Sequence, residues 1–481
     1  MKYTEMQPLS RLQEKKKTQI LVIGGGPSGV CAAVTAARMG SDVALIEQAG
    51  TCGGMATQGL VGPFMTCYDR SGSKMILRGI FEEVINRLVA CDGALHPSNI
   101  RCGTGYTSWI VVGHDHVTPF EPEALKRVFD EMLTEAKVKL LYHTLFLEPL
   151  MDCNKVRGAV IASKSGIEAI EADIVIDCTG DGDVAARAGV PFENGNEVLH
   201  TMQPATMFFR IGGVDSKKLY QEIEAHKGDF YRKDGVNYRS LHWRVAEARA
   251  NGDWTLDRVS IGIFQGVKPD EWNINTSRIM GIDSTNTESL TEGEIEGRRQ
   301  VDEIFRFLRK YVPGCENAHL LCSGSTLGIR ESRHICGERT LTLDDIVNGK
   351  TPDDSVLVCS NSADIHGRSG PKSNEYIVIR DGNWYGVPYG CMVPQKIDGL
   401  LVAGRCLSAT SDAAGAVRVI PPCMCMGQAV GVAAALAIHH NREPRSVLPE
   451  DIREHLRQQG AFLPDSERCC SLEERGNQLH L

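Results

Sequence analysis

Residues 18–48 read TQILVIGGGPSGVCAAVTAARMGSDVALIEQ. The apolar run 18–23 predicts a short buried strand, and a glycine-rich turn follows it directly. Small and apolar residues at helical spacing then predict a helix that ends near Gly40. Residues 42–48 predict a second strand, which carries an acidic residue, Glu47, at its end. This order of strand, turn, helix and strand predicts the start of a βαβ unit and therefore an α/β fold.

The turn has the spacing Gly24-x-Gly26-x-x-Gly29, which is typical of dinucleotide-binding folds. The first glycine permits the tight turn, the second lets the backbone approach a pyrophosphate, and the third lets the helix pack on the strand. The helix N-terminus would face the phosphates. Glu47, 18 residues after the last glycine, would accept hydrogen bonds from ribose hydroxyl groups. The alternative is a glycine-rich turn in another kind of α/β sheet.

The composition excludes several classes of protein. The chain has 481 residues, 42% of them hydrophobic, and 52 basic against 61 acidic residues give a net charge of −9. Because there is no basic surplus, a nucleic-acid partner is not expected. No uninterrupted apolar run reaches the ~18 residues of a membrane span, and the N-terminus lacks the apolar segment of a signal peptide. We therefore expect no membrane partner and a cytoplasmic location.

The 17 cysteines include no C-x-x-C pair, which argues against zinc-ribbon, ferredoxin-type and thioredoxin-type motifs. We expect reduced, mostly buried thiols and no metal site.

The sequence pattern divides the chain into five parts. Residues 1–17 are polar and predict a loose N-terminal arm. Residues 18–200 and 381–440 carry the glycine-rich segments and predict two parts of one dinucleotide-binding domain. Residues 201–380 contain polar helices and predict an inserted α+β cap or substrate domain, and residues 441–481 predict a C-terminal tail.

Two further glycine-containing segments are assigned to the nucleotide site. The segment CGGMAT (52–57) resembles the loop beside the flavin in flavoproteins with two dinucleotide-binding domains, which favours FAD over NAD. The segment DCTGDGD (177–183) ends a buried strand. Its spacing imitates a second fingerprint, Gly180-x-Gly182-x-x-Ala185, but no amphipathic helix and no strand with a terminal acid follow it. It matches instead the loop by which flavoproteins cover FAD.

Residues 400–438 complete this site. They predict a buried strand that ends at Gly404 and Arg405, followed by a helix of small residues whose start is favoured by two prolines. The N-terminus of that helix, directed at the flavin, would stabilise the reduced anion, and Arg418 would add a full charge. The alternative role for Arg418 is an interdomain salt bridge.

Together these segments resemble the FAD-dependent oxidoreductase family of bacterial flavoproteins, which is distantly similar to the fumarate reductase and succinate dehydrogenase flavoprotein group. The more specific matches are GIRESR (328–333), DIH (364–366) and VRVIPPCMCMGQA (417–429). The resemblance implies a Rossmann-like FAD-binding domain of the glutathione-reductase type with an inserted α+β cap, and FAD as cofactor.

The FAD-binding residues that the resemblance implies are Gly24, Gly26, Pro27, Ser28, Gly29, Glu47, Gln48, Cys52, Gly53, Gly54, Met55, Thr57, Phe146, Thr179, Gly180, Asp183, Gly404, Arg405, Val417, Arg418 and Val419. Phe146 or Leu145 would lie near the adenine. Relatives carry leucine in place of Cys52. This leaves open a redox-active thiol, a covalent link to flavin or a small apolar substitute.

The candidate catalytic residues are His366, Arg418, Arg330, Arg333 and Tyr385. His366 is the leading acid/base candidate because histidine titrates near neutral pH, and a core or capping role is the alternative. Arg330 and Arg333 are three residues apart, so on a helix they would share a face and clamp a carboxylate or a polyol. The alternative is an ion-pair network with neighbouring glutamates. Tyr385 would orient the substrate or pack at the domain junction.

The leading hypothesis is an enzyme that transfers hydride between the flavin N5 and a small polar metabolite at a CH–OH, CH–NH or activated C=C centre. Two alternatives are an electron-transfer subunit that works with a protein partner and a flavin-assisted enzyme without net oxidation. The sequence leaves open a homodimer and a protein electron acceptor.

Overall fold

The stretch 18–48 forms the predicted strand–turn–helix–strand unit in the computed structural model, which describes residues 13–196, 201–233, 236–367 and 375–464. β1 (Gln13–Ile23), α1 (Pro27–Arg38) and β2 (Val43–Ile46) follow one another, and β1 pairs with β2 in parallel. β1 begins at Gln13 rather than Thr18, because residues 13–17 continue the pairing with β6 (Gly166–Asp177). Part of the predicted arm therefore belongs to the sheet, and residues 1–12 lie outside the described residues.

The main sheet has seven strands in the order β3-β2-β1-β6-β5-β4, with β19 also paired to β6. The strands added here are β3 (Lys139–Leu141), β4 (Leu145–Asp152), β5 (Lys155–Ser163) and β19 (Leu400–Val402). The β3-β2-β1-β6-β19 pairings are parallel, whereas β4, β5 and β6 form an antiparallel extension. The carboxyl ends of β1, β2, β6 and β19 therefore meet at one edge, where open α/β sheets bind ligands.

Two small-residue helices pack closely on this sheet. α10 (Ile420–His439) lies beside α1, and a Cβ atom at Gly427 would come within 2.1 Å of the Ser28 carbonyl oxygen. Its two prolines occupy its first turn, as expected from the sequence. In the described part of the chain α10 is the one helix long and apolar enough to cross a membrane, and its apolar window is entirely buried in the protein interior.

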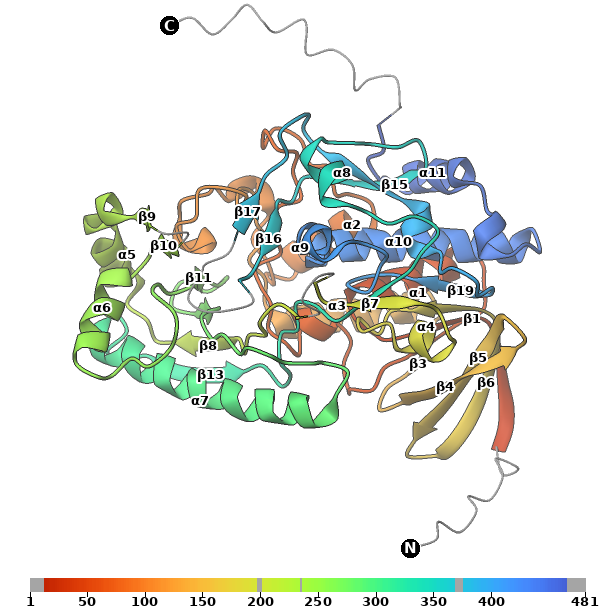
Figure 1. Ribbon diagram of the computed structural model, residues 1–481, viewed down its shortest axis with the longest axis horizontal. Coiled ribbons are helices and arrows are strands. Elements are labelled where there is room, and N and C mark those ends of the chain that lie inside the picture. Colours follow the sequence, from red (N-terminus) through yellow and green to blue (C-terminus); the bar gives the residue numbers. More distant parts are fainter. Residues whose placement is uncertain (1–12, 197–200, 234–235, 368–374, 465–481) are drawn as a thin grey trace, which may run out of the picture.

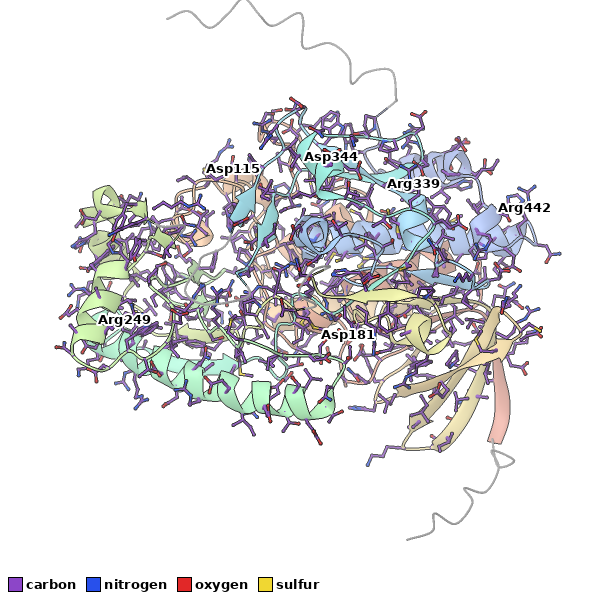
Figure 2. The ribbon with its side chains drawn as sticks, in the orientation of Figure 1. Asp115, Asp181, Arg249, Arg339, Asp344 and Arg442 are labelled. Atoms are coloured by element: carbon purple, nitrogen blue, oxygen red, sulfur yellow. The ribbon has the colours of Figure 1, made fainter. Side chains whose placement is uncertain are left out.

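Residues 205–327 build a second core around a four-stranded antiparallel sheet, in the order β11-β12-β8-β13. Its elements are β8 (Phe209–Gly212), α5 (Ser216–Ala225), β9 (Tyr231–Lys233), β10 (Val236–Tyr238), α6 (His242–Ala250), β11 (Ile263–Gln265), β12 (Trp272–Ile274), α7 (Thr287–Tyr311) and β13 (His319–Ser323). In Figure 1 this unit forms the left and lower part of the molecule, with α7 along its outer side. Arg249 on α6 marks its far end in Figure 2, whereas Asp181 lies in the middle of the molecule.

The residues that follow the second core return to the first one. Residues 341–393 place Leu357, Tyr385 and Val387 among the side chains of the first core. β15 (Ser355–Cys359) pairs with β18 (Tyr385–Pro388), and both strands contribute side chains to the first core. The segment 201–380 thus contributes to two cores. The elements in this part are β14 (Arg333–Ile335), α8 (Leu343–Val347), β16 (Ala363–Ile365), β17 (Glu375–Ile377) and α9 (Ser411–Val417).

The remaining elements complete the first unit. They are α2 (Ile80–Ala90), α3 (Pro122–Glu135), α4 (Asp183–Arg187), β7 (Phe192–Asn194) and α11 (Pro449–Gln458). α11 packs against α10 and β15, so residues 449–458 of the predicted tail are part of the fold, and residues 465–481 lie outside the described residues.

Candidate active site

The glycine turn after β1 opens onto a cavity of about 540 Å³. A Cβ atom at Gly26 would meet no atom within 4 Å, so a side chain there would project into open space. At Gly24, with φ +100°, and at Gly29, a Cβ atom would approach the Cys178 carbonyl oxygen to 2.5 Å and the Gly24 carbonyl oxygen to 1.8 Å. The first and third glycines are therefore required by packing, and the second leaves room for a ligand, as the fingerprint predicts.

No side chain caps the first turn of α1, so its free N–H groups lie at the cavity, where phosphate oxygens would accept from them. Pro27 and Ser28, in this first turn, both line the cavity. A dinucleotide pyrophosphate fits this position chemically and sterically.

Glu47 lies at the end of β2 and lines the same cavity. One carboxylate oxygen accepts the Gly25 N–H at 2.7 Å, and the other accepts the Ala49 N–H at 2.8 Å. Burial raises the pKa of Glu47 above its usual value. The carboxylate therefore joins the glycine turn to the loop after β2, in the position predicted for a ribose contact.

The loop 52–57 approaches the turn from the other side. The Gly53 N–H donates to the Gly25 carbonyl oxygen at 2.8 Å, and the Thr57 hydroxyl donates to the Cys52 carbonyl oxygen. These bonds hold Gly54 and Met55 at the cavity. Cys52 has no exposed surface, packs under Gly25, and burial raises the pKa of its thiol to about 12. Its surroundings are those of the small apolar substitute, and it does not line the cavity.

Asp177 organises the second glycine loop from the end of β6. Its buried carboxylate accepts hydrogen bonds from the Thr179 N–H and hydroxyl and from the Val184 and Ala185 N–H groups. The five-residue helix α4 and the three-residue strand β7 follow this loop, so residues 183–194 lack the long helix of a second dinucleotide fold. Thr179, Gly180 and Asp183 line the cavity.

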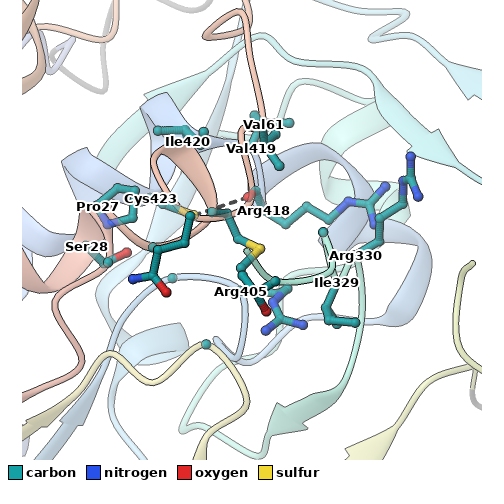
Figure 3. A pocket seen from close by; sticks show the side chains of 18 of the residues that line it. Pro27, Ser28, Val61, Ile329, Arg330, Arg405, Arg418, Val419, Ile420 and Cys423 are labelled. Carbon is teal, nitrogen blue, oxygen red and sulfur yellow. Dashed lines mark hydrogen bonds between the residues drawn. The ribbon is translucent and has the colours of Figure 1, made fainter. Parts of the chain in front are cut away.

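The carboxyl end of β19 closes the site. Gly404 has φ +100°, and a Cβ atom there would lie 2.8 Å from the Ser28 hydroxyl oxygen. Arg405 forms a 2.8 Å ion pair with Asp181. The first turn of α10 also reaches the cavity through Ile420 and Cys423. Figure 3 shows Pro27 and Ser28 on one side of this cavity and Arg330 and Arg418 close together on the other.

Among the candidate catalytic residues, His366, Arg330 and Arg418 meet at the cavity. His366 Nε2 lies 3.0 Å from Asp364 Oδ2. Burial and the charge of Arg330 lower the pKa of His366 to about 3, so the imidazole is neutral near pH 7. Burial raises the pKa of Asp364, but His366, Arg418 and Arg330 outweigh it and hold this pKa below its usual range.

The two arginines take their positions from different elements. Arg418, at the end of α9, donates to the Asp364 carbonyl oxygen at 2.9 Å. Arg330 donates to the Pro204 carbonyl oxygen and the Thr206 hydroxyl, both at 2.6 Å. Arg418 therefore supports the strand that carries Asp364, and Arg330 joins the cavity to the second unit.

The prediction of a shared helix face for Arg330 and Arg333 is wrong. Residues 324–332 form no helix, and Arg333 begins β14, which pairs with β7. Arg333 turns away from the cavity lining and forms a 2.8 Å ion pair with Asp183. Tyr385 is fully buried within β18 and donates to the Asn361 carbonyl oxygen, so it packs in the core instead of facing the cavity.

A family model for FAD dependent oxidoreductases matches residues 19–456. The chain belongs to this FAD-dependent oxidoreductase family. It is 30% identical over 182 residues to digeranylgeranylglycerophospholipid reductase of Methanoculleus marisnigri, and the match covers 37% of this chain and 42% of that relative. The matched region thus spans less than half the length of the relative.

Two solved structures are also similar to this oxidoreductase. A geranylgeranyl bacteriochlorophyll reductase-like protein from Thermoplasma acidophilum has 15% identity and a TM-score of 0.42, with 92% of this chain and 83% of that chain covered. L-Amino acid deaminase from Proteus myxofaciens has 10% identity and a TM-score of 0.46, with 89% and 91% covered.

The oxidoreductase uses FAD, and most residues predicted to bind it line the cavity. These are Gly24, Gly26, Pro27, Ser28, Glu47, Gln48, Gly54, Met55, Phe146, Thr179, Gly180, Asp183, Gly404, Arg405, Arg418 and Val419. The other predicted residues do not line the cavity, and they are Gly29, Cys52, Gly53, Thr57 and Val417.

Sequence reasoning missed several cavity residues from the second unit and its junction. Arg239 and Arg258 line the cavity, as do Asp181 and Tyr376. The two arginines stand in polar stretches without a motif, so nothing in their local sequence separates them from surface arginines. Asp181 carried a signal, since it lies inside the glycine loop 177–183.

Proposed function

We propose that this oxidoreductase transfers hydride between FAD and a small polar metabolite at a CH–OH, CH–NH or activated C=C centre. The observation that carries the proposal is one continuous cavity, with the glycine fingerprint at one end and the Asp364–His366 pair with two arginines at the other. FAD bound at the fingerprint end supplies a two-electron hydride acceptor or donor.

The residues at the other end supply proton transfer and charge. His366 is neutral near pH 7, and its Nε2 lies 3.0 Å from the Asp364 carboxylate, so the imidazole is able to take up a proton beside a negative charge. In an oxidation, His366 accepts the proton from the substrate O–H or N–H, and the imidazolium is stabilised by Asp364. In a reduction, the proton moves in the opposite direction. Arg330 and Arg418 favour negative charge that develops on the substrate oxygen.

The test is an anaerobic titration of the purified FAD-loaded enzyme with polyols, hydroxy acids, amino acids and NADH, followed by flavin absorbance. Bleaching by an organic compound supports the proposal and identifies the substrate class. Bleaching by NADH alone contradicts metabolite oxidation and indicates a reductase. A flavin that no compound reduces contradicts the proposal and favours an electron-transfer or non-redox role. His366→Ala is the matched variant because it removes the proposed proton acceptor. His366 is not among the residues predicted to bind FAD, so the variant should still bind FAD.

A further inference from the structure

Two guanidinium groups at the cap side of the cavity form no ion pair with any residue that the structure describes. Arg239 follows β10 and Arg258 precedes β11, and both line the cavity. Their Nε atoms are buried without a hydrogen-bond partner, and neither side chain pairs with a carboxylate of any residue that the structure describes. Arginines at the nucleotide end differ, because Arg405 pairs with Asp181.

Further arginines lie near these two and add to the local positive charge. Burial, together with the charges of Arg278 and Arg239, lowers the pKa of Arg258 to about 10. Burial and the charge of Arg418 lower the pKa of Arg330 to about 9. All of these groups are still protonated near pH 7. The carboxylate whose charge acts on Arg239, Arg258 and Arg330 alike is Asp364, and Asp257 also acts on Arg258. Asp364 is shared with Arg418 as well, so the positive charges around it outnumber it.

The uncharged neighbours add no negative charge. Burial lowers the pKa of His114 to about 4, so its ring is neutral, and burial raises the pKa of Tyr376 well above its usual value, so its hydroxyl stays protonated. Both residues line the cavity beside Arg239, and their rings lie 5.9 Å apart. This region therefore offers cationic and neutral groups to a bound molecule.

Buried positive charges without an anion are costly, and a ligand that brings the anion removes this cost. We propose that Arg239 and Arg258 form a subsite for an anionic group of the substrate, a carboxylate or a phosphate, which this subsite holds while the reacting carbon faces His366. The guanidinium fork suits either group through paired hydrogen bonds. The proposal deepens the proposed function and rests on it for the identity of the cavity as the substrate site.

The experiment compares charged probes with their uncharged counterparts on the FAD-loaded enzyme at constant ionic strength. The pairs are succinate with succinamide, and glycerol 3-phosphate with glycerol. Binding is measured by the flavin difference spectrum and by the midpoint of thermal unfolding. We expect at least one charged probe to bind at least about 10-fold more tightly than its counterpart, and the pair that responds distinguishes a carboxylate from a phosphate.

The variants are Arg239→Gln and Arg258→Gln, with Arg306→Gln as control. Arg306 lies on the exposed side of α7 and pairs with Asp302. We expect each cavity variant to retain FAD and to bind the charged probe about 10- to 100-fold more weakly, whereas the control binds it as the wild type does. Arg239→Lys keeps the charge and recovers part of the affinity, which separates charge recognition from a folding defect.

Equal binding of charged and uncharged probes, no binding of either charged probe, or unchanged affinity in both glutamine variants overturns the proposal. These measurements need no turnover. Anion binding with a flavin that no compound reduces therefore leaves the subsite in place and refutes the proposed function. Reduction by uncharged compounds that is unaffected in the glutamine variants refutes the subsite alone.

Discussion

His366 Nε2 lies 3.0 Å from Asp364 Oδ2 at the wall of the cavity. Asp364 belongs to the short strand β16, and His366 directly follows the last residue of that strand. The strand alternates its side chains, so residues two apart share a face and the pair is fixed by the backbone. This pair joins a neutral imidazole to an ionised carboxylate. In the function that we propose, the carboxylate orients the imidazole and stabilises its protonated form.

The first prediction concerns His366 and pH. Its pKa is about 3 in the folded protein and 6.5 in the unfolded chain, so between these values the unfolded chain binds more protons. Stability is therefore lost as pH falls from 6.5 towards 3. Between pH 7 and 5 the wild type should lose about 2 kcal/mol of unfolding free energy that His366→Gln does not lose. Urea unfolding of both proteins at the two pH values measures this, and equal losses contradict the shift.

The second prediction separates two glycines of the fingerprint. Gly26→Val places its side chain in the open cavity, so the protein should be purified without flavin and unfold at the temperature of the wild-type apoprotein. Gly29→Ala drives its Cβ atom into the Gly24 carbonyl oxygen, so it should lower the unfolding free energy by about 2–4 kcal/mol. Flavin content and thermal unfolding of both variants test this. A yellow Gly26→Val protein refutes the placement of the pyrophosphate.

The third prediction concerns Asp177 at the end of β6, which is not among the residues predicted to bind FAD. Asp177→Asn replaces one acceptor oxygen by an NH₂ group that faces backbone N–H donors, so it should disorder the loop 178–185. We expect FAD to bind at least about 10-fold more weakly and unfolding to require about 1–3 kcal/mol less. Fluorescence titration of the apoprotein with FAD gives the affinity. Asp152→Asn, at an exposed position on β4 outside the cavity lining, is the control.

Cys52 gives the fourth prediction. Acid precipitation of the wild type should release all of its flavin, because the thiol is buried under Gly25 and its pKa is about 12. Cys52→Ala should keep FAD and turnover and lose about 1 kcal/mol of stability through a small cavity. Flavin that stays with the precipitated protein would instead support a covalent link between Cys52 and the flavin.

The fifth prediction tests Tyr385 as a structural residue. Its hydroxyl donates to the Asn361 carbonyl oxygen at 3.1 Å within the core. Tyr385→Phe should lower the unfolding free energy by about 1 kcal/mol and leave kcat and KM unchanged. A large loss of kcat in a protein of normal stability would return Tyr385 to the catalytic set.

The sequence by itself determined the nucleotide end of this protein. Gly24, Gly26 and Gly29, Glu47 and the loop 177–183 are local devices, in which residue type and spacing along one segment dictate a turn, a free helix end and a covering loop. For these residues the structure repeats the prediction because each contact is made within a few residues or between adjacent parallel strands.

Only the tertiary structure decided the substrate end. Arg239 and Arg258 come from the second unit, Arg330 from the stretch after it, and the Asp364–His366 pair from β16 and the residue after it, so no spacing in the sequence relates them. The prediction that Arg330 and Arg333 share a helix face is wrong because β14 pairs with β7, which places Arg333 in a strand. Burial, which makes His366 neutral and lowers the pKa of Arg239 and Arg258, exists only after the two cores have packed together, since a short motif does not encode the distance of a side chain from water.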